Sequence, residues 1–175
     1  MRKLKNSELG RISVENFKNS KKSPIVVVLD NVRSALNVGS VFRTSDAFRI
    51  EKIYLCGITA TPPNKEIRKS ALGATESVKW EKVEDTESVI KKLKSEGYHI
   101  CAIEQTENSI MLNDFSPAEK PIAVVFGHEV NGVQQSVVDL CNQSIEIPQI
   151  GTKHSLNISV SVGIVIWDLY KNIIG

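Results

Sequence analysis

The segment 24–30, PIVVVLD, is the sequence feature that most narrows the fold. It is a short, mostly β-branched apolar run without polar alternation. Runs of this kind are typical of strands that are buried on both faces, as in parallel sheets covered by helices. The run is also far shorter than the roughly 20 apolar residues that a membrane helix needs. This segment therefore favours a soluble α/β fold.

The rest of the chain alternates between short apolar strands and helices, which predicts a mainly parallel sheet with helices on both faces. One domain is expected over residues 23–175, because its length suffices for a full hydrophobic core and no linker interrupts it. Further strands are expected at 52–56, near Trp80, at 98–103, 122–126 and 144–147, and helices at 38–48, 86–96 and 133–140, with a short basic helix after the Pro-rich loop near 62.

The basic excess of the chain is confined to residues 1–22. This arm carries seven Lys and Arg residues against two acidic ones, whereas the other 153 residues carry 15 basic and 18 acidic side chains. Such an arm suits contacts with the phosphates of a polyanion. A solvated, frayed terminus is an equally good interpretation of the charge pattern alone.

The N-terminus and the cysteines indicate a cytoplasmic protein. No apolar block follows the first basic residues, so no secretory signal is expected. Cys56, Cys101 and Cys141 lie far apart, without a C-x-x-C pair, and each is in or beside an apolar segment. They are therefore expected to be reduced, buried thiols, and no metal site is predicted.

Ligands of open α/β sheets bind outside the carboxyl ends of the strands. The predicted ends are 30–31 (DN), 104–105 (EQ), 127–129 (GHE) and 148–151 (PQIG). The last two are rich in glycine and polar side chains, as a ligand-binding rim requires. The segment after them is ambiguous: Leu156, Ile158, Val160 and Val162 alternate with small polar residues, which by itself predicts a strand.

Three motifs resemble the signature of the TrmH/SpoU-type RNA 2′-O-ribose methyltransferases of the SPOUT superfamily. They are N-x-G-x-x-x-R at 37–43, FGHEVNGV at 126–133 and SLNISVSVG at 155–163, in this order and each at a predicted strand end or helix. The resemblance covers residues 24–171. It implies an α/β fold with a deep C-terminal trefoil knot, an exception to the rule of un-knotted chains, and a helix at 156–170 in place of the strand.

The resemblance also implies a function. It points to transfer of a methyl group from S-adenosyl-L-methionine to a ribose 2′-hydroxyl of structured RNA, either tRNA or rRNA, by a homodimer with its active sites at the interface. An alternative hypothesis is an RNA-binding protein of the same fold with little or no catalytic activity. A hydrolase that uses Ser155 with His154 is not expected, because adjacent residues rarely present both side chains to one carbonyl and no G-x-S-x-G motif is present.

Five residues match the family's catalytic positions. Because a guanidinium is hard to deprotonate, Arg43 is expected to hold a phosphate and stabilise the developing alkoxide rather than act as a base. Asn37 can bind substrate or cap its helix, and Glu129 can orient Arg43 or the ribose. Ser155 is expected near the reacting hydroxyl, although it can also cap the last helix, and Asn157 is expected to hold the loop or the substrate. His128 and His154 occupy variable motif positions and are not expected to act as bases.

Cofactor contacts are expected mainly from backbone groups at the strand ends. No G-x-G-x-x-G motif follows a strand, which argues against a Rossmann-type enzyme. Gln149 departs from the family pattern, which commonly has methionine after Ile-Pro, and leaves the shape of the pocket open. The residues that match the family's cofactor positions are Glu104, Gln105, Phe126, Gly127, Ile147, Pro148 and Leu156.

Overall fold

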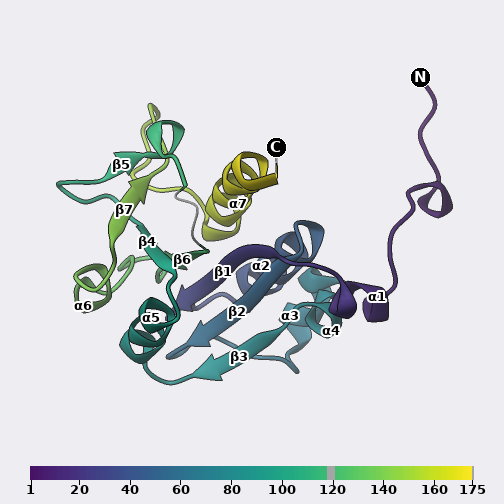
Figure 1. Cartoon of the computed structure of the whole chain (residues 1–175), viewed down its shortest axis with the longest axis horizontal. Coiled ribbons are helices and arrows are strands. Elements are labelled where there is room, and N and C mark those ends of the chain that lie inside the picture. Colours follow the sequence, from purple (N-terminus) through teal and green to yellow (C-terminus); the bar gives the residue numbers. More distant parts are fainter. Residues whose placement is uncertain (118–120, 175) are drawn as a thin grey trace.

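The computed structural model describes residues 1–117 and 121–174. In this part of the chain, seven parallel strands form one sheet in the order β3-β2-β1-β6-β4-β7-β5 (Figure 1). The α/β class is confirmed, and the sheet is wholly rather than mainly parallel. The strands are β1 (Ser23–Asp30), β2 (Ile50–Cys56), β3 (Trp80–Val83), β4 (His99–Ile103), β5 (Ile110–Met111), β6 (Ile122–Phe126) and β7 (Gln143–Glu146).

The helices follow the predicted alternation, with shifts of a few residues at their ends. Two α-helices, α3 and α4, follow the Pro-rich loop, where one was predicted, and α6 is shorter than expected. No helix in the described ranges is long and apolar enough to cross a membrane. The helices are α1 (Val14–Asn19), α2 (Ala35–Ala47), α3 (Lys65–Ala71), α4 (Ala74–Ser77), α5 (Thr86–Ser95), α6 (Gln135–Val138) and α7 (Ile158–Ile174), with 3₁₀ turns at Asn6–Glu8 and Leu112–Asp114.

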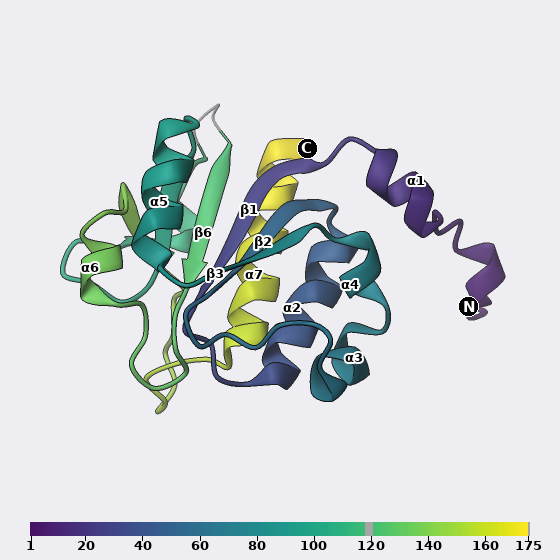
Figure 2. The same cartoon turned by 90° about the horizontal axis from the view of Figure 1, so that it is seen from below.

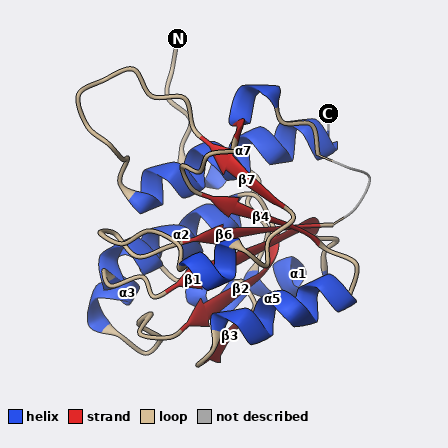
Figure 3. Ribbon diagram, turned by 90° about the vertical axis from the view of Figure 1, so that its left-hand side faces the viewer, coloured by secondary structure: helices blue, strands red, loops and turns tan. Residues whose placement is uncertain are grey.

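Strand β1 is buried on both faces of the sheet, as its continuous apolar run predicted. Ile25, Val27 and Leu29 pack into one core with residues of α2, α3 and α7. Val26 and Val28 point to the other face and pack with residues of α5 and α6. Figures 2 and 3 show these two helical layers on opposite faces of the sheet.

The last segment is a helix, as the resemblance implied, and the strand indicated by its periodicity is wrong. Helix α7 begins at Ile158, two residues later than expected. Ile158 and Val162 are buried against the sheet, whereas Val160 and Ile164 lie on the exposed face of the same helix. Two apolar faces separated by small polar residues produce an alternation in sequence that resembles a strand. The knot stays a prediction.

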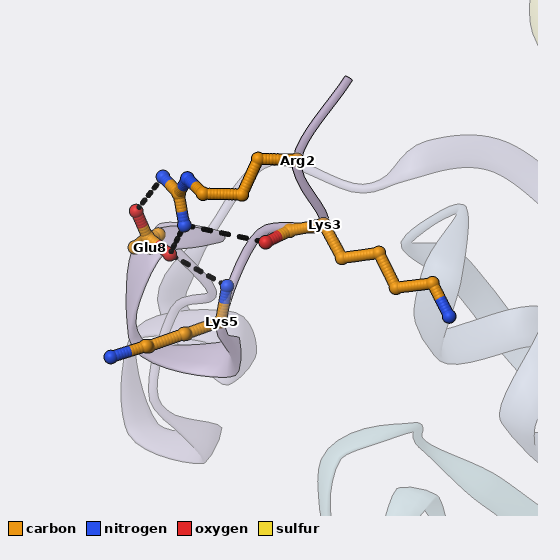
Figure 4. Close-up of polar contacts among 4 residues, drawn as sticks. All are labelled: Arg2, Lys3, Lys5 and Glu8. Carbon is orange, nitrogen blue, oxygen red and sulfur yellow. Dashed lines mark hydrogen bonds and ion pairs between the residues drawn. The ribbon is translucent and has the colours of Figure 1, made fainter.

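The N-terminal arm is partly ordered by its own contacts. The Glu8 carboxylate accepts two hydrogen bonds from the Arg2 guanidinium, at 2.7 and 3.0 Å, and one from the Lys5 backbone N–H at 2.6 Å (Figure 4). Farther along, α1 is anchored by Phe17, which is buried in the core. Residues before α1 project away from the body of the molecule (Figure 1). The arm is therefore tethered through α1, and its contact with RNA stays a prediction.

The three cysteines are free thiols. Cys56 and Cys101 are buried, as expected, but Cys141 is only partly buried. Burial raises the pKa of Cys101 to about 12 and that of Cys141 to about 11. Both thiols are therefore protonated at neutral pH.

Candidate functional site

A cavity of about 410 Å³ opens at the carboxyl ends of β6, β4 and β7, which are neighbours in the sheet. Residues of the segment 147–157 and of the first turn of α7 complete its walls. The carboxyl ends of the strands are where the sequence predicted a ligand site. Pro148 does not line the cavity. The other six predicted cofactor contacts all do: Glu104, Gln105, Phe126, Gly127, Ile147 and Leu156.

The lining of the cavity combines acidic and apolar side chains. Glu104, Glu129 and Glu146 contribute carboxylates, and no lysine or arginine is among the described residues that line it. Apolar contact surface comes from Ile103, Phe126, Ile145, Ile147, Leu156 and Ile158. Because carboxylates attract cations, this cavity suits a small ligand that carries positive charge beside an apolar group.

A tight turn after β6, residues 127–133, forms one wall. The backbone of His128 exchanges two hydrogen bonds with that of Gly132, at 2.9 and 3.0 Å. A Cβ atom on Gly127 would lie only 2.1 Å from the carbonyl carbon of Gly132 and from the nitrogen of Val133. Gly127 is therefore needed for the close approach of two backbone segments. His128 Nδ1 accepts hydrogen bonds from the N–H groups of Val130 and Asn131, so this nitrogen is used by the turn.

The two residues after β4 hold the turn and the facing loop. One Glu104 oxygen accepts a hydrogen bond from the Val133 N–H at 3.0 Å, and the other accepts one from the Gln105 N–H at 2.9 Å. The Gln105 amide donates to the carbonyl oxygen of His154 at 2.7 Å. The end of β4 thus links the 127–133 turn to the loop that contains His154.

Glu129, Asn37 and Asn157 form a hydrogen-bonded chain at the rim. The Glu129 carboxylate accepts from the N–H groups of Arg33 and Ser34, both at 2.9 Å, and from the Asn37 side chain at 3.1 Å. The Asn157 amide donates to Asn37 Oδ1 at 3.3 Å. Burial alone would raise the Glu129 pKa, but these hydrogen bonds outweigh it and lower the pKa below its usual value.

The sequence interpretation of Asn37 as a helix cap is wrong, whereas an orienting role of Glu129 toward Arg43 stays a prediction. Ser34, not Asn37, caps α2, because the Ser34 hydroxyl accepts from the Asn37 N–H. Within the described ranges, no hydrogen bond or ion pair joins Glu129 to Arg43, so Glu129 does not orient this arginine within one chain. Glu129 instead holds the loop before α2.

Ser155 and Asn157 have different positions at the start of α7. Both line the cavity. The Asn157 side-chain oxygen accepts hydrogen bonds from the N–H of Ser159 at 2.9 Å and from its hydroxyl at 2.6 Å. Asn157 therefore caps α7, and the interpretation of Ser155 as the cap is wrong. Ser155 is exposed, and its hydroxyl has no hydrogen-bond partner among the described residues.

Arg43 lies outside the cavity. Its side chain is exposed on α2 and lines a separate, open groove beside α3 and α7. The five predicted catalytic residues are therefore divided within one chain. Glu129, Ser155 and Asn157 line the cavity, Asn37 is bonded to its rim, and Arg43 is apart from it.

The sequence was compared with protein families and with known proteins. The model of the SpoU rRNA Methylase family matches residues 24–167. The chain belongs to this SpoU family. A Staphylococcus haemolyticus protein assigned by name to the TrmH family of tRNA/rRNA methyltransferases is 28% identical over 158 residues, which are 90% of this chain and 63% of that protein. This chain thus spans less than two thirds of that relative.

Solved structures confirm the SpoU fold. The crystal structure of the A. aeolicus TrmH/SpoU tRNA modifying enzyme superposes with a TM-score of 0.81 at 25% identity and covers 91% of this chain and 81% of that one. An AdoMet-bound rRNA methyltransferase from Sinorhizobium meliloti superposes with a TM-score of 0.82 at 24% identity, over 91% of this chain and 61% of that one. The second likeness concerns the fold alone.

Asp30 was predicted at a strand end but without a role, whereas the structure shows that it holds two elements beside the site of this SpoU-family chain. The Asp30 carboxylate is fully buried at the end of β1. It accepts hydrogen bonds from the Thr86 hydroxyl at 2.6 Å, the Gln134 N–H at 2.9 Å and the Asn31 amide at 3.0 Å. Asp30 therefore ties the start of α5 and the far end of the turn to the sheet. An acidic residue after a buried strand was the available signal, but its partners are remote in sequence.

Several residues that line the cavity were also not among the predicted contacts. Gln149, the departure from the family pattern, is one of them and is partly buried there. Glu146 is another, and its carboxylate accepts a hydrogen bond from the Ser109 hydroxyl at 3.0 Å. The remaining unpredicted lining residues are Ile103, His128, Val130, Gly132, Ile145, Ile158 and Ser161.

Proposed function

We propose that the protein is a cytoplasmic, S-adenosylmethionine-dependent methyltransferase that modifies a ribose 2′-hydroxyl of tRNA or rRNA. Membership of the SpoU family supports the methyltransferase class and the RNA substrate. The observation that carries the proposal is the acidic cavity at the strand ends, because it lies where six of the expected cofactor contacts converge.

S-adenosylmethionine fits the chemistry of this cavity. The cofactor carries a sulfonium and an ammonium group against one carboxylate, so its net charge is positive. Glu104, Glu129 and Glu146 complement that charge, and the apolar lining suits the faces of an adenine ring. A volume of about 410 Å³ falls within the range of small-molecule sites. When bound, the cofactor would supply an electrophilic methyl group on sulfur.

The chain's own residues would position the acceptor and stabilise charge. A 2′-hydroxyl is a very weak acid, so orientation and stabilisation of the developing alkoxide supply most of the effect. Ser155, which lines the cavity, approaches the reacting hydroxyl. The always-charged Arg43 holds the adjacent phosphate and stabilises the alkoxide. Glu129, Asn37 and Asn157 keep the rim in place.

A homodimer would bring these groups together. Arg43 and Ser155 line different hollows of one chain, so one copy lacks a complete site. Helix α7 presents Val160, Ile164 and Trp167 to solvent, and these residues are 49%, 37% and 54% exposed. A second copy that covered this apolar face would bury it and could place its Arg43 over the cavity of the first.

The activity is tested by incubating the protein with bulk tRNA and rRNA and S-adenosylmethionine radiolabelled in its methyl group. A 2′-O-methyl group blocks alkaline cleavage of the neighbouring phosphodiester, so the label should appear in alkali-stable dinucleotides. Label recovered only in mononucleotides would reject the ribose as acceptor. Absence of label from both RNA pools would favour an RNA-binding protein without catalysis.

The shared site is tested by mixing two inactive variants, Arg43→Ala and Ser155→Ala. If the two residues act across the interface, exchange of subunits creates mixed dimers with one intact site each. Activity should then return to about one quarter of the wild-type level, because half of the dimers are mixed. No recovery, despite exchange shown by differently tagged subunits, would reject the shared site.

The N-terminal arm is proposed to contact RNA phosphates. Because Phe17 is part of the core, a deletion should stop before α1 and remove only residues 1–13. This shorter protein should bind RNA more weakly and with a smaller dependence on salt, while its cofactor affinity is kept. Unchanged RNA affinity would reject this role of the arm.

A further inference from the structure

A second hollow of the molecule lies between α2, α3 and α7 and does not belong to the cavity described above. It is an open groove with a volume of about 520 Å³. We call it the α2–α3 groove. Its lining consists of two cationic side chains, three hydroxyl side chains and a small apolar floor: Arg43, Lys69, Ser40, Thr44, Ser70, Ala47, Phe48 and Gly163.

The walls of the groove are fixed by close packing of α3 on α2. A Cβ atom on Gly39 would lie 2.5 Å from the carbonyl oxygen of Ile67, so the two helices meet at the glycine of the N-x-G-x-x-x-R motif. The Ser70 hydroxyl donates to the carbonyl oxygen of Leu36 at 2.9 Å and joins the helices at this point. Lys69 is therefore presented beside α2 by a rigid contact rather than by a loose loop.

The charge of the groove is opposite to that of the cavity. Arg43 and Lys69 are both exposed, and neither makes a hydrogen bond or ion pair within the described ranges. No carboxylate is among its described lining residues. The Ser40 and Ser70 hydroxyls already donate to the carbonyl oxygen of Leu36. The donors that remain for an anion are Arg43, Lys69 and the Thr44 hydroxyl, and groups of these three kinds all donate to phosphate oxygens.

We infer that the α2–α3 groove binds backbone phosphate of the RNA substrate and that Lys69 is a phosphate-binding residue beside Arg43. This inference rests on the proposed function. To Arg43 on α2 it adds a second cationic residue, Lys69, on α3. The groove holds the RNA strand, whereas the acidic cavity holds the cofactor. The groove and the cavity therefore favour ligands of opposite charge.

The inference is tested by measuring RNA affinity over a series of salt concentrations for Lys69→Ala and for Lys65→Ala. Both changes remove one exposed lysine from α3, but Lys65 does not line the groove. Loss of one phosphate contact should reduce the slope of log affinity against log salt by about 0.7–0.9 in Lys69→Ala. Lys65→Ala should keep the wild-type slope, and Lys69→Arg should restore it.

Two readouts separate this inference from the proposed function. Cofactor affinity should be unchanged in Lys69→Ala, because Lys69 does not line the cavity, and the loss should appear in KM for RNA rather than in kcat. Equal slopes for Lys69→Ala and Lys65→Ala, in a protein that methylates RNA, would overturn the groove but leave the methyltransferase standing. A wild-type protein that binds the cofactor but no RNA would overturn both.

Discussion

Replacing Gly127 with alanine should destabilise the protein and abolish cofactor binding together. The new Cβ atom would lie 2.1 Å from two backbone atoms of the 127–133 turn, where ordinary contacts are at least 3.4 Å. The turn and the end of β6 would have to separate by more than 1 Å. Because the obstructing atoms belong to the backbone, no side-chain rotation relieves the clash.

The expected loss of stability follows from the packing and the hydrogen bonds at this close contact. Insertion of a methyl group into a tightly packed site costs about 1–3 kcal/mol. Separation of the turn also weakens the two His128–Gly132 hydrogen bonds and the one between Val133 and Glu104, each of which contributes about 1 kcal/mol. Since some of these bonds would re-form in a shifted position, the free energy of unfolding should fall by about 2–4 kcal/mol.

Gly151→Ala is the matched control, because Gly151 lies in the loop after β7 and a Cβ atom there meets no other atom within 4 Å. Urea unfolding gives the stability of both variants, and calorimetric titration with S-adenosylmethionine gives their cofactor affinity. Gly151→Ala should unfold within about 0.5 kcal/mol of the wild type. If Gly127→Ala matched this control in stability and affinity, the close approach would not constrain the site.

Four further predictions concern single residues. Asn157→Ala should lower stability by about 0.5–2 kcal/mol through loss of the α7 cap, whereas Ser155→Ala should impair methyl transfer with a thermal unfolding curve close to that of the wild type. Because hydrogen bonds hold the Glu129 pKa below its usual value, the ionised carboxylate contributes to stability above that usual value, and the contribution is lost as the pH falls through the lowered pKa; Glu129→Gln should therefore lose less stability in acid, as measured by urea unfolding. Cys101, buried and with a pKa of about 12, should resist alkylation at neutral pH until denaturant is added, as followed by mass spectrometry.

The fold was largely predictable because its strands are encoded locally. Apolar runs such as 24–30 and 122–126 can be satisfied only in a sheet covered on both faces. Strand β5 was missed because two residues carry no periodic pattern. Helix α7 was predicted correctly only from the family resemblance, because its buried and exposed faces are both apolar.

The site was predictable as a set of positions but not as a set of contacts. Asn37 is bonded to Glu129 over 92 residues of sequence and to Asn157 over 120. Sequence spacing does not predict contacts between residues so far apart. The motifs therefore indicated chemical roles for these residues but not the hydrogen bonds by which they hold the rim. The role of Asp30 was not predicted for the same reason, because its carboxylate accepts a hydrogen bond from the backbone N–H of Gln134, 104 residues away.

The construction of the cavity from the ends of β4, β6 and β7 and the start of α7 has a consequence for biosynthesis. A growing polypeptide has no place for the cofactor until the ribosome has passed residue 161, the last in the chain to line the cavity. A ligand that binds only the native state stabilises that state by mass action and does not stabilise the partly folded states that precede it. Cofactor supply would thus act on the maturation of each new molecule, before any RNA is encountered.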